Sequence, residues 1–165
     1  MKKIGVFYGT STGNTENVAE LIAKGMGATT YDVADSPIGA VAECEVLILG
    51  TSTLGIGDLQ DDWDDFLPKL KDADLDGKTV ALFGLGDADS YPDSFVDGMG
   101  IIYNVLKDKG CTIVGAVDTE GYDYDESIAE VDGQFVGLVI DEDNESDKTN
   151  ARIDSWIELI KAQIS

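Results

Sequence analysis

The sequence predicts an α/β fold in which a doubly wound parallel sheet is covered by helices on both faces. Continuous apolar runs, typical of strands buried on both sides, alternate along the 165 residues with segments whose apolar side chains recur at helical spacing. Alternation of this kind favours a parallel sheet with right-handed crossovers. The length suits one domain, and we assign residues 1–165 to it.

The first predicted strand, at residues 4–8, leads into a loop rich in glycine and hydroxyl groups. Apolar residues then recur on one face of a predicted helix at Val18, Ala19, Leu21, Ile22 and Met26. Backbone N–H groups and the helix dipole converge where such a loop enters a helix, so the loop is a candidate anion site. Its residues are Gly9, Thr10, Ser11, Thr12, Gly13, Asn14, Thr15 and Glu16.

The composition of this loop limits the anion that it can hold. A nucleotide-triphosphate loop has four residues between its glycines and then a lysine, whereas three residues separate Gly9 from Gly13 and Asn14 follows. The nearest basic residues, Lys3 and Lys24, lie outside the loop. Amides and hydroxyls alone can hold one phosphate monoester, which we predict as the ligand. The simpler alternative is a polar turn that only caps the helix.

The remaining elements continue the alternation. Further strands are expected at residues 29–33, 46–50, 79–83 and 111–117, and further helices at 38–42, 63–70, 95–106 and 153–164. Ligands of such sheets bind beyond the carboxyl ends of the strands. The loops after the third and fourth strands, at residues 51–57 and 84–96, are rich in glycine and hydroxyl groups like the first loop. We therefore expect these three loops to form one site.

An acidic segment at residues 118–140 breaks the alternation and ends in a further strand candidate at residues 134–140. We interpret it as an insertion that interrupts the fifth strand or its exit. Two interpretations of its role stay open, a solvated flap and a surface for docking a partner.

Charge and composition exclude several classes of function. The formal net charge is −22, from 33 acidic and 11 basic residues, which disfavours binding to nucleic acid or to anionic membranes. Such a charge steers the protein towards basic protein surfaces, although solubility alone could explain it. There is no histidine, so hydrolytic triads and histidine metal sites are excluded. The chemistry is therefore expected to belong to a bound cofactor and not to a metal.

The sequence also indicates where the protein works. No apolar run reaches the length of a membrane span, and the N-terminus has no signal-peptide pattern, so a cytoplasmic location is expected. Cys44 and Cys111 lie in apolar stretches, and we interpret them as buried structural residues.

The three loops together resemble those of the flavodoxin family, and the resemblance covers essentially the whole chain. The matching segments are residues 9–16, residues 51–60 with Trp63 beyond them, and residues 84–87 followed by Tyr91. The insertion and residues 137–144 are similar to the long-chain branch of the family. The resemblance implies the strand order 2-1-3-4-5 and bound FMN, whose single phosphate agrees with the anion predicted for the first loop.

The resemblance also implies which residues contact FMN. The phosphate would be held by the first loop, and the flavin ring would lie between the second and third loops with Tyr91 stacked on one face. Backbone groups near Asp87, Ser94 and Val96 would meet the edge of the ring, and Asp143 would contact the ribityl chain. The implied site residues are Thr10, Ser11, Thr12, Gly13, Asn14, Thr15, Thr51, Ser52, Thr53, Leu54, Gly55, Ile56, Gly84, Leu85, Gly86, Asp87, Tyr91, Ser94, Phe95, Val96 and Asp143.

Two residues of the second loop are of special interest. Leu54 stands where many family members have tryptophan, and an aliphatic side chain covers the ring without the aromatic pair energy of roughly 1 kcal/mol. Gly55 lies where the family's peptide can flip on reduction and stabilise the neutral semiquinone. Glycine makes that flip inexpensive because it reaches positive φ without a Cβ penalty.

The resemblance implies a low-potential one-electron carrier that shuttles between semiquinone and hydroquinone, and not an enzyme. It would act as a monomer and dock by acidic surfaces onto basic faces of flavin reductases and low-potential oxidoreductases. The alternative is an FMN-dependent quinone or NAD(P)H oxidoreductase of similar fold. A receiver-like signalling domain is disfavoured, because the first strand does not end in acidic residues.

Overall fold

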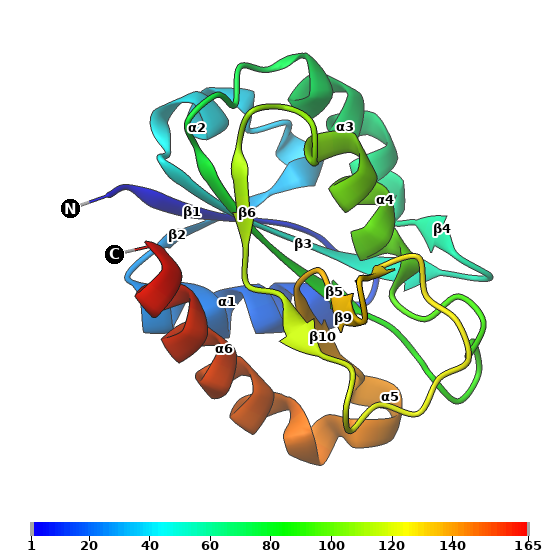
Figure 1. Ribbon diagram of the computed structural model, residues 1–165. Coiled ribbons are helices and arrows are strands. Elements are labelled where there is room, and N and C mark those ends of the chain that lie inside the picture. Colours follow the sequence, from blue (N-terminus) through cyan, green and yellow to red (C-terminus); the bar gives the residue numbers. More distant parts are fainter. Residues whose placement is uncertain (1, 165) are drawn as a thin grey trace.

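The computed structural model describes residues 2–164 and contains a central parallel sheet between two layers of helices (Figure 1). Its strands run in the order β10-β5-β3-β1-β2, and β6 also pairs with β5. This is the predicted order 2-1-3-4-5, with β6 and β10 as two parts of the fifth strand. The parallel strands are β1 (Ile4–Gly9), β2 (Thr29–Asp32), β3 (Val46–Leu54), β5 (Thr79–Leu85), β6 (Thr112–Val114) and β10 (Leu138–Ile140).

Helices cover both faces of the sheet. On one face lie α1 (Asn14–Met26) and α6 (Thr149–Ile164), and on the other lie α2 (Ile38–Glu43), α3 (Asp61–Asp72) and α4 (Asp97–Leu106) (Figure 1). Each face has its own apolar cluster. Val6 and Phe7, neighbours in β1, belong to different clusters because successive side chains of a strand point to opposite faces. Within residues 2–164, no helix has both the length and the apolar character needed to cross a bilayer.

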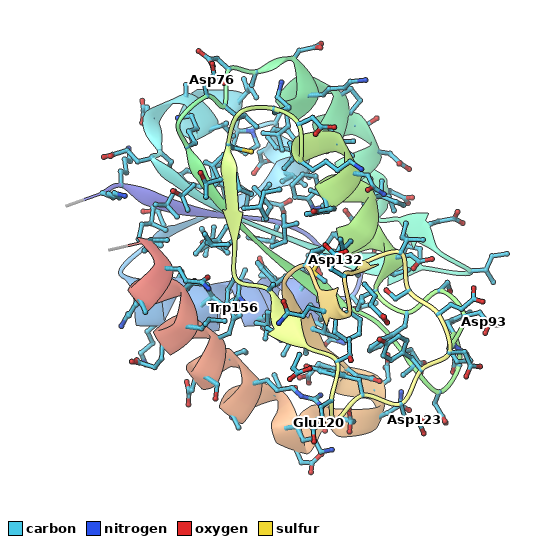
Figure 2. All side chains as sticks on the ribbon, in the orientation of Figure 1. Asp76, Asp93, Glu120, Asp123, Asp132 and Trp156 are labelled. Atoms are coloured by element: carbon cyan, nitrogen blue, oxygen red, sulfur yellow. The ribbon has the colours of Figure 1, made fainter. Side chains whose placement is uncertain are left out.

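The fifth strand is interrupted, as predicted, but the strand expected at residues 111–117 is shorter. It ends at Val114 because Gly115 has a φ of 90°, in the left-handed region. Trp156, which points from α6 towards the sheet (Figure 2), donates a hydrogen bond from Nε1 to the Gly115 carbonyl at 2.8 Å. The chain returns to the same sheet edge at Leu138, so residues 115–137 form the insertion.

Within the insertion, a small antiparallel sheet contains the first part of the strand expected at residues 134–140. It consists of β7 (Val117–Asp118), β8 (Glu130–Val131) and β9 (Gln134–Phe135), in the order β7-β9-β8. Between β9 and β10 the backbone of Gly137 passes so close to β5 that a Cβ atom there would lie 2.0 Å from the Leu82 carbonyl oxygen. The predicted strand is therefore two strands in two sheets.

Other element ends also differ from the prediction. The loop expected at residues 51–61 contains a hairpin, because β3 continues to Leu54 and pairs with β4 (Asp58–Leu59). The helix expected from Phe95 begins at Asp97, because Val96 has a φ of 49° and lies outside it. A short helix, α5 (Glu142–Glu145), follows β10 and was not predicted.

Candidate functional site

The first loop leaves the N-terminus of α1 open. Gly13 occupies the N-cap position with a φ of 92°, and no side chain of the described part of the chain caps the helix. The Gly13 amide donates instead to Thr10 Oγ1 at 2.9 Å, a bond within the loop. The first N–H groups of a helix have no partner in the helix itself, so an uncapped end is free to bind an anion.

Two residues at the start of α3, Gln60 and Trp63, pack against this loop. Gln60 is 1 % exposed, and its Nε2 atom donates to Ser11 Oγ at 3.4 Å. A Cβ atom at Gly9 would lie 2.3 Å from Gln60 Oε1 and 2.6 Å from the Trp63 ring, so only glycine fits there. Trp63 Nε1 in turn donates to the Gly50 carbonyl at 2.8 Å. These contacts connect the first loop to β3.

The second loop begins at the end of β3. Thr53 Oγ1 accepts a hydrogen bond from the Gly98 amide at 2.9 Å, whereas Ser52 Oγ is buried and has no partner among residues 2–164. A buried hydroxyl without a partner is uncommon in a folded protein and indicates a position where a ligand can bind. Gly55, with a φ of 50°, lies in the turn between β3 and β4. The side chain of Ile56, at the tip of this turn, is 84 % exposed.

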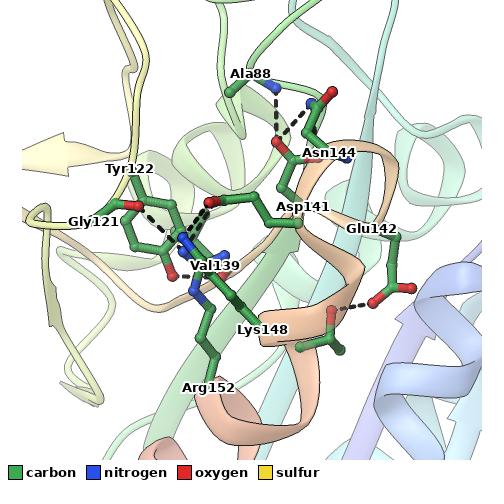
Figure 3. Close-up of polar contacts among 11 residues, drawn as sticks. Ala88, Gly121, Tyr122, Val139, Asp141, Glu142, Asn144, Lys148 and Arg152 are labelled. Atoms are coloured by element: carbon green, nitrogen blue, oxygen red, sulfur yellow. Dashed lines mark hydrogen bonds and ion pairs between the residues drawn. The ribbon is translucent and has the colours of Figure 1, made fainter.

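The third loop is fixed to the segment after β10. The buried carboxylate of Asp141 accepts a hydrogen bond from the Ala88 amide at 3.1 Å and bonds from Asn144 (Figure 3). Asn144 Nδ2 also donates to Asp87 Oδ1 at 2.8 Å. Partial burial acts to raise the pKa of Asp87, but hydrogen bonds from Ser90 and Asn144 outweigh it and hold the pKa below its usual value.

The three loops enclose a cleft of about 430 Å³ at the carboxyl ends of the strands, where a doubly wound sheet binds its ligand. None of the residues described as lining the cleft is basic, and three are carboxylates. The pKa of one of them, Asp143, is raised by burial and by Asp87, Asp141 and Glu142. The lining residues are Ser11, Thr12, Asn14, Thr15, Ser52, Thr53, Leu54, Leu85, Gly86, Asp87, Tyr91, Glu142 and Asp143.

The other residues expected at the site do not line the cleft, and some of them pack beneath the loops. Thr51, for example, is fully buried and donates to the Ser52 carbonyl at 2.9 Å. The side chain of Phe95 packs on Tyr124 and Phe135 of the insertion, with ring centroids 5.5 and 6.0 Å away. The non-lining set is Thr10, Gly13, Thr51, Gly55, Ile56, Gly84, Ser94, Phe95 and Val96.

Sequence reasoning missed Glu142 in the lining and Gln60 behind the first loop. Glu142 follows β10 directly, so its place at the carboxyl end of a strand could have indicated it. Gln60 ends the segment 51–60 that resembles the family, but its residue type gave no signal of its own, because glutamine is not a typical N-cap residue.

A larger depression, about 580 Å³, lies between α6 and the start of the insertion. It is mostly apolar, and Arg152 and Lys148 on its wall are paired with Glu145 at 3.0 and 2.7 Å (Figure 3). The three loops do not contribute to it, so we assign the functional site to the smaller cleft.

Comparison with known proteins identifies the family. The model of the flavodoxin family matches residues 6–156. The chain belongs to the flavodoxin family. A flavodoxin of Nostoc sp. is 44 % identical over 165 residues, which cover 98 % of this chain and 97 % of that protein. A flavodoxin of Klebsiella pneumoniae is 41 % identical, over 99 % of this chain and 96 % of its own length.

Among solved structures, Fusobacterium nucleatum flavodoxin bound to flavin mononucleotide superposes with a TM-score of 0.94 at 34 % identity, over the full length of both chains. The flavodoxin family and the flavodoxin fold predicted from the sequence are thus confirmed. The insertion agrees with the long-chain type.

Proposed function

We propose that this chain acts as a single-domain, monomeric electron carrier that binds FMN in the cleft between the three loops. The proposal rests on one observation. An uncapped α1 N-terminus, the unpartnered Ser52 hydroxyl and the Tyr91 ring all border the same cleft. Its volume lies in the range of cofactor sites. Family membership makes the chain an electron-transfer protein and not an enzyme. The Fusobacterium nucleatum relative, of the same fold, is bound to flavin mononucleotide.

The residues present fit each part of FMN. The α1 N-terminus and the hydroxyls of Ser11, Thr12 and Thr15 would hold the phosphate, because they offer donors without a basic residue. Ser52 would donate its free hydroxyl hydrogen to the cofactor. When bound, FMN supplies the electron chemistry, because it can accept and release electrons one at a time.

Leu54 and Tyr91 would flank the flavin ring, since both line the cleft from opposite loops. Each excludes water from one side of the ring, and Tyr91 adds an aromatic stacking energy. Gly55 is positioned to let the neighbouring peptide change orientation at little cost, because its φ of 50° lies where other residues are strained.

Acidic surfaces would select the redox partner. Asp93, Glu120 and Asp123 are exposed and project from the edge of the molecule (Figure 2), and the net charge is −22. We propose that basic faces of flavin reductases and low-potential oxidoreductases dock there. The free thiols of Cys44 and Cys111 fit the reducing cytoplasm that we propose as its location.

Titration of the apoprotein with FMN tests the proposal. We expect binding of one FMN per chain, and weaker binding of riboflavin, which lacks the phosphate held by the first loop. Equal affinity for riboflavin would contradict the phosphate assignment. Turnover of NAD(P)H with a quinone by the isolated protein would contradict its role as a carrier.

Substitution of Leu54 by tryptophan is expected to tighten FMN binding about fivefold, because an aromatic ring adds roughly 1 kcal/mol of stacking energy. Fluorimetric titration of the two apoproteins measures the change. Ile56→Trp is the matched control, because Ile56 is 84 % exposed and does not line the cleft. Unchanged or weaker binding by Leu54→Trp would show that the ring is not stacked on this residue.

Substitution of Asp143 by asparagine is expected to raise the midpoint potential of the second electron by roughly 20 to 70 mV, because a carboxylate of the cleft opposes added negative charge. Potentiometric titration at pH 8 and low ionic strength measures it. Asp154→Asn, an exposed position on α6, is the control. Equal shifts in both variants would show that the general charge of the protein, not the cleft carboxylate, sets the potential.

A further inference from the structure

The insertion folds back onto the third loop and does not project as a free flap. The Pro92 carbonyl accepts hydrogen bonds from the amides of Asp125 at 2.8 Å and Glu126 at 2.9 Å. The Phe95 amide donates to the Glu126 carbonyl at 3.2 Å, and the Phe95 carbonyl accepts from Ser127 Oγ. Both backbone groups of Phe95 are therefore bonded to the insertion.

The side chain of Phe95 strengthens this connection. It is 1 % exposed and lies among three aromatic rings of the insertion, with centroids 5.5 Å away at Tyr124, 6.0 Å at Phe135 and 6.1 Å at Tyr122. Aromatic pairs at such separations stabilise a fold beyond the area that they bury. The third loop is thus anchored in the small core of the insertion.

Asp97, the first residue of α4, connects the insertion with the second loop. Its Oδ1 atom accepts a hydrogen bond from the Ile128 amide at 2.9 Å. Its Oδ2 atom would lie 2.9 Å from a Cβ atom at Gly57, so the carboxylate closely approaches the turn of the second loop. The adjacent Gly98 amide donates to Thr53 Oγ1 at 2.9 Å. One helix end therefore contacts both the insertion and the second loop.

Val96, between these two anchors, has an unfavourable backbone conformation. Its φ of 49° is a genuine outlier for a β-branched residue, and its side chain is fully buried. Such a conformation is strained and persists only where surrounding contacts impose it. Here the contacts on both sides, at Phe95 and Asp97, come largely from the insertion.

We propose that residues 125–129 are a positioning element of the cofactor site, which holds the second and third loops in binding geometry before FMN arrives. This inference rests on the proposed function. A cleft ordered in advance binds more tightly because ordering the loops no longer opposes association. Ser127 and Asp97 are the positioning residues, and neither lines the cleft.

Removal of either side chain tests the inference. Ser127→Ala and Asp97→Ala are each expected to weaken FMN binding about tenfold and to speed amide hydrogen exchange at residues 93–98 of the apoprotein. Asp97→Asn keeps an acceptor for the Ile128 amide and is expected to stay within about twofold of the original affinity. Ser155→Ala, an exposed serine on α6, is the matched control and should change neither quantity.

The outcomes separate this inference from the proposed function. Unchanged FMN affinity with unchanged exchange at residues 93–98 would overturn the inference, as would faster exchange spread evenly over the whole chain. If Ser127→Ala does not fold, the Asp97→Ala and Asp97→Asn pair still decides the question. Failure of the unaltered apoprotein to bind FMN would refute the proposed function instead, and the exchange comparison would still test whether residues 125–129 order the loops.

Discussion

Substitution of Thr12 by aspartate is expected to weaken FMN binding by about a hundredfold. Thr12 is exposed in the first loop and lines the cleft, so the variant should fold normally while placing a carboxylate beside the proposed phosphate site. Two unit charges about 5 Å apart at an effective dielectric of 20 repel by roughly 3 kcal/mol, and each 1.4 kcal/mol is a factor of ten in affinity. The added carboxylate would also compete for the N-terminus of α1.

Two variants make this experiment specific. Thr12→Asn has a similar shape without the charge and is expected to lose much less affinity. Ser155→Asp adds the same charge on an exposed face of α6, away from the cleft. Fluorimetric titration of the apoproteins compares all three. A loss of equal size for Ser155→Asp would mean that net charge, and not the first loop, controls FMN affinity.

Substitution of Gly50 by alanine is expected to lower the free energy of unfolding by about 1–3 kcal/mol. Gly50 lies in β3, in register with Tyr8 of β1 and Phe83 of β5. A Cβ atom there would lie 1.9 Å from the ring of Phe83, which is itself fully buried. A closely packed core does not absorb such an overlap without displaced side chains or backbone.

Urea denaturation of the apoprotein measures this effect, and Gly39→Ala is the matched control. Gly39 lies in α2, and a Cβ atom there would meet nothing within 4 Å. Alanine in a helix is favoured over glycine, so that variant should gain about 0.5–1 kcal/mol. If Gly50→Ala were as stable as the original protein, Phe83 would have to repack freely, and the interior of the sheet would be less closely packed than the structure indicates.

The alternation of strands and helices and the three loops could be predicted because they depend on local signals, whereas the strand order followed from the resemblance to the flavodoxin family. The run at residues 46–50 is apolar without interruption, as a strand covered on both faces must be. Element ends were less predictable, because distant contacts fix them. The left-handed conformation of Val96 excludes Phe95 from α4, and its neighbours bond to the insertion more than thirty positions later in the sequence.

In the candidate site, too, some features could be predicted from local sequence and others could not. Hydroxyls such as those of Ser52 and Thr53 could be assigned to the cleft from their place after a strand. The sequence left the role of the insertion open because its acidic composition fits a flap and a docking surface equally well. Several hydrogen bonds that attach it to the third loop join backbone amides and carbonyls, which residues of nearly every type carry, so composition does not reveal these bonds.

Because the fifth strand is split, the insertion could be removed without disturbing the central sheet. Val114 pairs with Ala81 and Leu138 with Phe83, so the two parts of the strand leave one sheet position, opposite Leu82, between them. A single residue could bridge that gap and keep every side chain on its present face. The insertion could therefore be added or removed without changing the register of the central sheet. Its removal would alter how the cofactor loops are held and would preserve the sheet on which they stand.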